Sequence, residues 1–203
     1  MNKMKKRKIY LLRHAEPLLT SRGAKIFLGG QSDPPLSPAG NRQAEALAAA
    51  LSGVDLEAVY CSDLRRSRQT AAAIAPKCGM VPRVCPALRE IGLGEWEGMT
   101  FAEVQSRYQR EFRERGENIV SYQPPGGESF ADLARRVLPA FRRIVAETGG
   151  NIAIIGHAGV NRVILCHVQQ LDLALLFGIR QEYGQITVIE QNNKLFRITK
   201  KGL

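Results

Sequence analysis

The sequence is poor in cysteine and histidine and contains no long apolar segment. Its 4 cysteines form no C-x-x-C pair, and none is grouped with the 3 histidines at the spacing of a zinc site. We therefore expect reduced thiols and no metal. No stretch approaches the roughly 18–20 apolar residues of a membrane-spanning helix, and the apolar run behind the basic N-terminus is too short for a signal peptide. These absences predict a cytoplasmic protein that does not enter a membrane.

Sequence motifs of several enzyme classes are also missing. There is no P-loop, no G-x-S-x-G and no H-E-x-x-H sequence. The glycines between Leu88 and Gly98 do not match the dinucleotide-binding pattern, because no preceding strand leads directly into a helix there. We therefore expect no cofactor.

Acidic residues are scarce relative to basic ones. The chain has 29 Lys and Arg against 19 Asp and Glu, a net charge of +10. Half of this excess lies in Lys3, Lys5, Lys6, Arg7 and Lys8. We interpret residues 1–8 as a flexible basic tail and residues 9–203 as one domain. The remaining excess is spread out and suits the attraction of an anionic small molecule, so we do not expect nucleic acid to be the primary partner.

Two short apolar runs, residues 9–14 and 152–157, both end at a histidine. Runs of this length with β-branched members are typical of strands that are covered on both faces, as in parallel sheets. Ligand sites of open α/β sheets form beyond the carboxyl ends of such strands. His14 and His157 are therefore candidates for one site, and Arg13 beside the first of them suggests an anionic substrate.

Strand and helix signals alternate along the chain, which predicts an α/β sandwich. Ser37-Pro38 and Ser129 are predicted to start helices, and Thr100 with Glu103 forms a capping-box pattern. Helical spacing continues through Tyr108 and Phe112. We further expect a helix over 63–75, strands near 80–84, 186–190 and 195–198, and a bend or a lost hydrogen bond at Pro139.

Two further segments carry chemistry. Residues 62–71 combine the end of a strand, the start of a helix and several arginines, a combination that suits a phosphate. Residues 88–98 place Glu90 in a glycine-rich turn.

Taken together, these segments resemble the histidine phosphatase superfamily, the branch that contains cofactor-dependent phosphoglycerate mutase, the fructose 2,6-bisphosphate bisphosphatase and α-ribazole phosphatase. The resemblance spans nearly the whole chain, in five ordered blocks besides Leu11–Glu16: residues 30–38, 62–71, 88–98, 125–129 and 156–160. It implies a three-layer α/β/α sandwich with a mostly parallel central sheet.

The resemblance also implies a role for each site residue. His14 is the nucleophile that forms a phosphohistidine, and Glu90 is the proton donor. Arg13, Arg66 and His157 hold the transferring phosphoryl group. Chemistry agrees, because phosphoryl transfer needs positioning and charge stabilisation more than covalent help. The attack requires a neutral His14 whose other nitrogen donates to a fixed acceptor, for which we expect a backbone carbonyl.

This sequence departs from the family pattern at two positions. Ala15 replaces the usual glycine, which requires a negative φ there, and Thr20 stands where many members carry a phosphate-binding asparagine. With Gln31 and Ala158, Thr20 completes the substrate-binding residues that we expect beside Arg13, Arg66 and His157.

The leading functional hypothesis is a metal-independent phosphatase acting on a small phosphomonoester, with α-ribazole 5′-phosphate as one candidate. Phosphoglycerate mutase is the alternative, disfavoured because the segment between Glu90 and His157 is short. An inactive phosphate-binding module is a second alternative. The loops around residues 15–36 and 101–128 are expected to wall the leaving-group pocket, with Tyr108, Phe112 and Tyr122 offering apolar surface. The sequence is also compatible with a homodimer.

Overall fold

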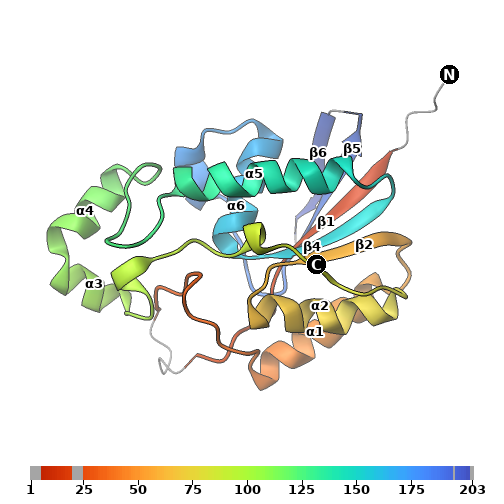
Figure 1. Ribbon diagram of the computed structural model, residues 1–203, viewed down its shortest axis with the longest axis horizontal. Coiled ribbons are helices and arrows are strands. Elements are labelled where there is room, and N and C mark those ends of the chain that lie inside the picture. Colours follow the sequence, from red (N-terminus) through yellow and green to blue (C-terminus); the bar gives the residue numbers. More distant parts are fainter. Residues whose placement is uncertain (1–5, 20–24, 194, 202–203) are drawn as a thin grey trace.

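The computed structural model describes residues 6–19, 25–193 and 195–201 (Figure 1). These residues form a six-stranded sheet in the order β3-β2-β4-β1-β5-β6. Its strands are β1 (Arg7–Arg13), β2 (Leu56–Cys61), β3 (Arg83–Val84), β4 (Asn151–Gly156), β5 (Ile186–Asn192) and β6 (Leu195–Lys201). The first four strands of that order run parallel, whereas β5 and β6 are antiparallel to their neighbours. The central sheet is therefore mostly parallel, as predicted.

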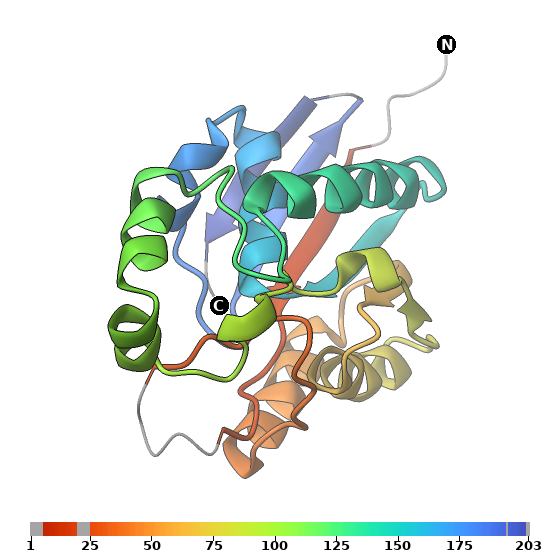
Figure 2. The same ribbon diagram turned by 60° about the vertical axis from the view of Figure 1, so that its left-hand side comes forward.

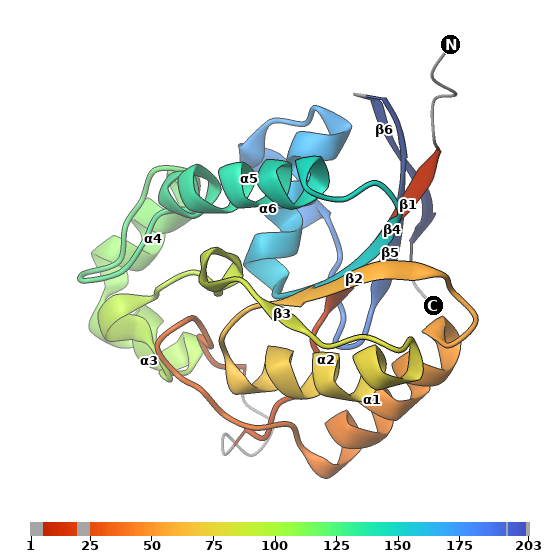
Figure 3. The same ribbon diagram turned by 45° about the vertical axis from the view of Figure 1, so that its right-hand side comes forward.

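Helices cover both faces of this sheet (Figure 3). On one face lie α1 (Pro38–Leu51) and α2 (Arg65–Lys77), and on the other lie α5 (Phe130–Ala146) and α6 (Ala158–Gln169). Successive strand residues point to opposite faces. Leu12 accordingly belongs to the core with α1 and α2, while Leu11 belongs to the core with α5 and α6. The apolar runs are buried on both sides, and the three-layer α/β/α sandwich is confirmed.

The predicted helix starts are confirmed by their caps. Ser37, with Pro38 behind it, accepts a hydrogen bond from Gly40 N–H and begins α1. Thr100 and Ser129 both form complete capping boxes. The helix α5 continues through Pro139, and α2 begins two residues later and ends two residues later than predicted.

The segment expected to continue as one helix through Phe112 is instead divided at Tyr108. It forms α3 (Phe101–Arg107) and α4 (Gln109–Glu117), with Tyr108 in a non-helical conformation (φ −124°, ψ 47°). Both helices stand beyond the end of the sheet (Figure 2). The rings of Tyr108 and Phe112 lie 6.0 and 6.5 Å from that of the buried Trp96. The break lets both aromatic residues pack on one indole.

The strand β1 begins inside the expected basic tail. Arg7 is buried, with 7% of its surface exposed, and its guanidinium donates to Thr148 O at 2.5 Å and to Val145 O. These carbonyls follow or end α5, where unpaired carbonyls attract a cation. Arg7 and Lys8 are therefore strand residues, and the prediction of a tail to residue 8 was wrong for them.

Among the residues that the structure describes, none of the helices has the length and apolar character needed to span a bilayer.

Candidate active site

The carboxyl ends of three adjacent strands bring the two histidines together. Arg13 pairs with Gly156 in the parallel register of β1 and β4, and His14 N–H donates to Gly156 O at 3.1 Å. The two imidazole rings therefore follow neighbouring strand ends, with centroids 4.9 Å apart. Ser62 follows β2, the strand on the other side of β4. The site lies where the apolar runs predicted it.

His14 is held in one tautomer. Its Nδ1 lies 2.7 Å from Ala15 O, and because a carbonyl can only accept, Nδ1 carries the proton. Burial, followed by the charges of Arg66 and Arg13, holds the pKa of His14 well below its usual 6.5. The ring is therefore neutral and Nε2 has a free lone pair. The expected backbone acceptor is confirmed, and Ala15 adopts the negative φ that its methyl group requires.

His157 is held by the opposite nitrogen. Its Nε2 lies 2.7 Å from Ser62 Oγ, and Ser62 Oγ already accepts Leu64 N–H at 3.3 Å. Burial and the neighbouring His14 hold the pKa of His157 well below 6.5, so this ring is also neutral. Ser62 Oγ and His157 Nε2 are both satisfied when the Ser62 hydroxyl donates its proton to Nε2. The proton of the neutral imidazole then lies on Nδ1. His157 then offers one N–H to a ligand.

Arg13 and Arg66 are both anchored through backbone carbonyls. Arg13 Nη1 donates to Gln181 O at 2.7 Å, while Arg66 donates to Ser32 O at 2.9 Å and to Gly29 O at 2.8 Å. Burial lowers the pKa of both arginines, but from a value so high that both stay charged.

Three buried nitrogens of these residues lack a hydrogen-bond partner within the described part of the chain: Arg13 Nε, Arg66 Nε and His157 Nδ1. Buried donors are nearly always paired in proteins. Two cations and one neutral N–H therefore remain available to the oxygens of an anionic ligand. Their chemistry suits a phosphoryl group.

Glu90 joins the site through the start of α6. Its two carboxylate oxygens accept Ile91 N–H and Gly159 N–H, each at 3.0 Å. A Cβ at Gly159 would lie 2.5 Å from Glu90 Oε1, so a side chain at this position would displace the carboxylate. Arg136 donates to Glu90 O at 2.9 Å and pairs with Glu128 at 2.8 Å. Glu90 is 7% exposed and is fixed from both its backbone and its carboxylate.

Two adjoining cavities open beside these residues, with volumes of about 840 and 390 Å³. Arg13 lines the larger and Glu90 the smaller, and Ala158, the first residue of α6, lines both. Their shared apolar wall is formed by Ile26, Leu28, Phe101 and Phe177. The predicted aromatic wall was wrong, since Tyr108, Phe112 and Tyr122 pack around Trp96 instead.

The two remaining predicted binding residues have different outcomes. Gln31 is at the surface, and its Oε1 accepts Gly94 N–H at 2.5 Å. Its role toward substrate stays a prediction. Thr20 lies outside the described residues.

Sequence reasoning missed Ser62 and Tyr183 as parts of the site. Ser62 was predicted only as the first residue of the phosphate-binding segment 62–71, and nothing local indicates that its hydroxyl meets a histidine 95 residues away. The Tyr183 ring lies 3.8 Å from Arg13 Cζ and 5.5 Å from the His14 ring. Its position just before an apolar strand, β5, was the available signal.

Fold and site together define a histidine phosphatase. Residues 9–202 match the model of the histidine phosphatase superfamily (branch 1). The chain belongs to this family.

Several known proteins are similar to the chain. The human 6-phosphofructo-2-kinase/fructose-2,6-bisphosphatase 4 is 36% identical over 163 residues, which cover 79% of this chain but 32% of that protein. The chain thus spans about a third of the length of the curated relatives it matches. The mycobacterial glucosyl-3-phosphoglycerate phosphatase is 27% identical, with a TM-score of 0.84 and coverage of 95% and 97% of the two chains. The α-ribazole phosphatase of Shigella flexneri, 22% identical with a TM-score of 0.87 and coverage of 97% and 96%, shares the fold.

Proposed function

We propose that this protein hydrolyses a small phosphomonoester through a phosphohistidine on His14. One observation carries the proposal. The Nδ1–H of His14 is donated to Ala15 O at 2.7 Å, and burial beside two arginines keeps the pKa of this ring low. A neutral imidazole with a free Nε2, held among cations, is a nucleophile prepared for a phosphoryl group.

The proposed reaction has two steps. The Nε2 lone pair attacks phosphorus while the bond to the ester oxygen breaks, and Glu90, as the general acid, gives a proton to that oxygen. Water then attacks the phosphohistidine, Glu90 takes a proton from it, and the N–P bond breaks to release phosphate and free His14. Arg13, Arg66 and His157 Nδ1–H neutralise the oxygens in both steps, as preorganised donors do. These residues can do so without a metal.

The residues that line the two cavities indicate the chemical character of the leaving group that we propose. Leu28, Phe101 and Phe177 provide apolar surface, while Arg115 and Arg162 provide charge. Neither arginine has a carboxylate partner among the described residues. These features support a leaving group with both apolar surface and negative charge, such as a sugar phosphate that carries a second phosphate or a carboxylate.

A panel of phosphomonoesters tests the proposal, assayed with a chelator present. It includes fructose 2,6-bisphosphate, glucosyl-3-phosphoglycerate, α-ribazole 5′-phosphate and phosphoserine. We expect hydrolysis by the wild type, none by His14→Ala, and an acid-labile phosphate trapped on His14. The matched control is His167→Ala, since His167 lies in the last turn of α6. Equal hydrolysis by His14→Ala would refute the mechanism, and conversion of 3-phosphoglycerate to 2-phosphoglycerate would identify a mutase instead.

A further inference from the structure

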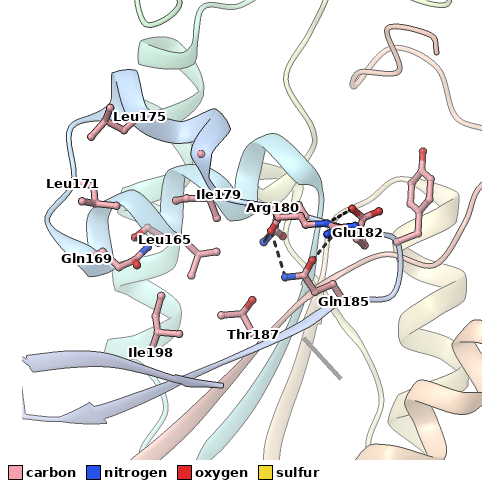
Figure 4. Close-up of a pocket in the computed structure, with 13 residues that line it drawn as sticks. Leu165, Gln169, Leu171, Leu175, Ile179, Arg180, Glu182, Gln185, Thr187 and Ile198 are labelled. Carbon is pink, nitrogen blue, oxygen red and sulfur yellow. Dashed lines mark hydrogen bonds and ion pairs between the residues drawn. The ribbon is translucent and has the colours of Figure 1, made fainter. Parts of the chain in front are cut away.

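Residues 180–185 form a braced loop between the 3₁₀ helix η3 (Leu173–Gly178) and β5. Arg180 pairs with Glu182 at 2.6 Å, Glu182 N–H donates to Gln185 Oε1 at 2.7 Å, and Gln185 Nε2 donates back to Arg180 O at 3.3 Å. Figure 4 shows these three side chains gathered at one end of a cavity of about 630 Å³, with Leu171 and Leu175 at the other end. The loop is thus closed on itself by its own hydrogen bonds.

The same loop is bonded to the end of β1. Arg13 N–H donates to Gln185 O at 3.0 Å, and Gly184 N–H donates to His14 O at 3.2 Å. These bonds fix the backbone of the loop relative to the backbone of the nucleophile.

The loop also holds the Arg13 side chain from two directions. Gln181 O accepts Arg13 Nη1 at 2.7 Å, and the Tyr183 ring lies 3.8 Å from Arg13 Cζ. A cation over an aromatic face at this distance is attracted to it. Because Nη1 is used and one face is covered, the guanidinium keeps an orientation in which Nε, which is buried and lacks a partner among the described residues, stays free.

Gln181 is itself anchored to the second histidine's helix. It is 5% exposed, and its Oε1 accepts Asn161 Nδ2 at 2.9 Å. Asn161 lies in the first turn of α6, four residues after His157, and is fully buried. Two hydrogen bonds therefore connect α6, the helix that begins directly after His157, to Gln181 and Gln181 to Arg13.

From these contacts we propose that Tyr183 and Gln181 are positioning residues that set the direction of Arg13 toward the phosphoryl group. Tyr183 lines the larger of the two cavities beside Arg13 and also the cavity of about 630 Å³. Tyr183 is partly buried, and the Arg13 guanidinium lies over its ring. The proposal rests on the proposed function, in which Arg13 binds the transferring group.

A double-mutant cycle with Arg13 tests the proposal. The readouts are kcat/KM for phosphate-ester hydrolysis and the Kd of orthovanadate, measured by calorimetry. We expect Tyr183→Leu to lower kcat/KM about tenfold and to raise the Kd about tenfold, whereas Tyr183→Phe, which keeps the ring, changes each by less than about threefold. In an Arg13→Lys background, Tyr183→Leu should change both by less than about threefold. An unreduced effect in that background, or equal losses for Phe and Leu, would overturn the proposal.

A second variant guards against a folding defect in Tyr183→Leu. Gln181→Leu removes the acceptor of Asn161 and should weaken orthovanadate binding in the same way. Its matched control is Gln169→Leu, because Gln169 lines the same cavity but donates only to Leu165 O, at 3.1 Å. If Gln181→Leu and Gln169→Leu weaken orthovanadate binding equally, the proposal is contradicted. Orthovanadate binding without any hydrolysis by the wild type would instead overturn the proposed function and leave the positioning role intact.

Discussion

The ring centroids of His14 and His157 lie 4.9 Å apart, and each ring is hydrogen-bonded through a different nitrogen. His14 is fixed through Nδ1 by Ala15 O, and His157 is fixed through Nε2 by the Ser62 hydroxyl. Two chemically identical side chains therefore offer different functions, a lone pair in one and an N–H in the other. The asymmetry is built by the hydrogen-bond partner of each ring.

Ser62 should be required for rate more than for stability. The variant Ser62→Ala removes the group that fixes the His157 tautomer, and we expect kcat to fall about tenfold or more because the ring can then adopt the other tautomer. The matched control is Thr148→Ala, which removes a buried hydroxyl just beyond α5 that donates to Ile144 O at 2.7 Å and has no contact with Ser62. It should lower the melting temperature with little change in kcat. Equal losses of kcat in both variants would count against a specific role.

Arg136 should hold Glu90 in place. Its guanidinium donates to three carbonyls, those of Ala87, Arg89 and Glu90, besides pairing with Glu128. We expect Arg136→Met to lower the free energy of unfolding by about 2 kcal/mol, a value reduced for the partial exposure of the pair, and to lower kcat. The matched control is Arg135→Met, at an arginine whose side chain is 77% exposed, which should change neither the free energy of unfolding nor kcat. Urea titrations and steady-state assays of both variants measure these two quantities. The expectation fails if Arg136→Met keeps full activity.

Replacing Ala15, the residue after His14, by glycine should lower stability but change activity little. Ala15 is fully buried and has a negative φ. Ala15→Gly therefore loses a buried methyl group and adds flexibility to the unfolded chain, and we expect a loss of about 1–2 kcal/mol of stability. The hydrogen bond from His14 to the carbonyl of residue 15 is kept, so kcat should stay within about twofold. A large fall in kcat would show that the methyl group itself positions His14.

Stability should fall on acidification below about pH 6.5. The pKa values of His14 and His157 are well below 6.5 in the folded protein, whereas the unfolded chain binds protons near that pH. Above it both states are neutral and the shift has no effect. Below it the unfolded state gains protons, and each histidine should remove about 1.4 kcal/mol per pH unit until its folded pKa is reached.

Urea unfolding between pH 7.5 and 5.5 measures this dependence. At the acidic end of this range, the variant His157→Gln should reduce the slope of unfolding free energy against pH by about 1.4 kcal/mol per pH unit, the equivalent of one proton. An unchanged slope would mean that His157 titrates normally in the folded protein.

The sequence predicted the backbone of the site better than its hydrogen bonds. The apolar runs before His14 and His157 place them at adjacent strand ends, because parallel strands present their carboxyl ends at one edge of the sheet. The family resemblance supplied Arg66 and Glu90. The contact between Ser62 and His157, and that between Tyr183 and Arg13, join segments far apart in the chain and have no local signal. Periodicity showed that Tyr108 and Phe112 face a core, but could not show that Trp96, rather than a ligand, is their partner.

Arg7 sets a limit on how far the chain can be shortened at its N-terminus. Its side chain closes the corner between β1, the end of α5 and the residues leading to β4, through Val145, Thr148 and Gly150. Removing residues 1–8 would take away this arginine together with the first pairing of β1 to β5, whereas removing residues 1–5 leaves both. A truncated form intended to test the basic N-terminus must therefore begin at Lys6, or it will measure the loss of a structural cation instead.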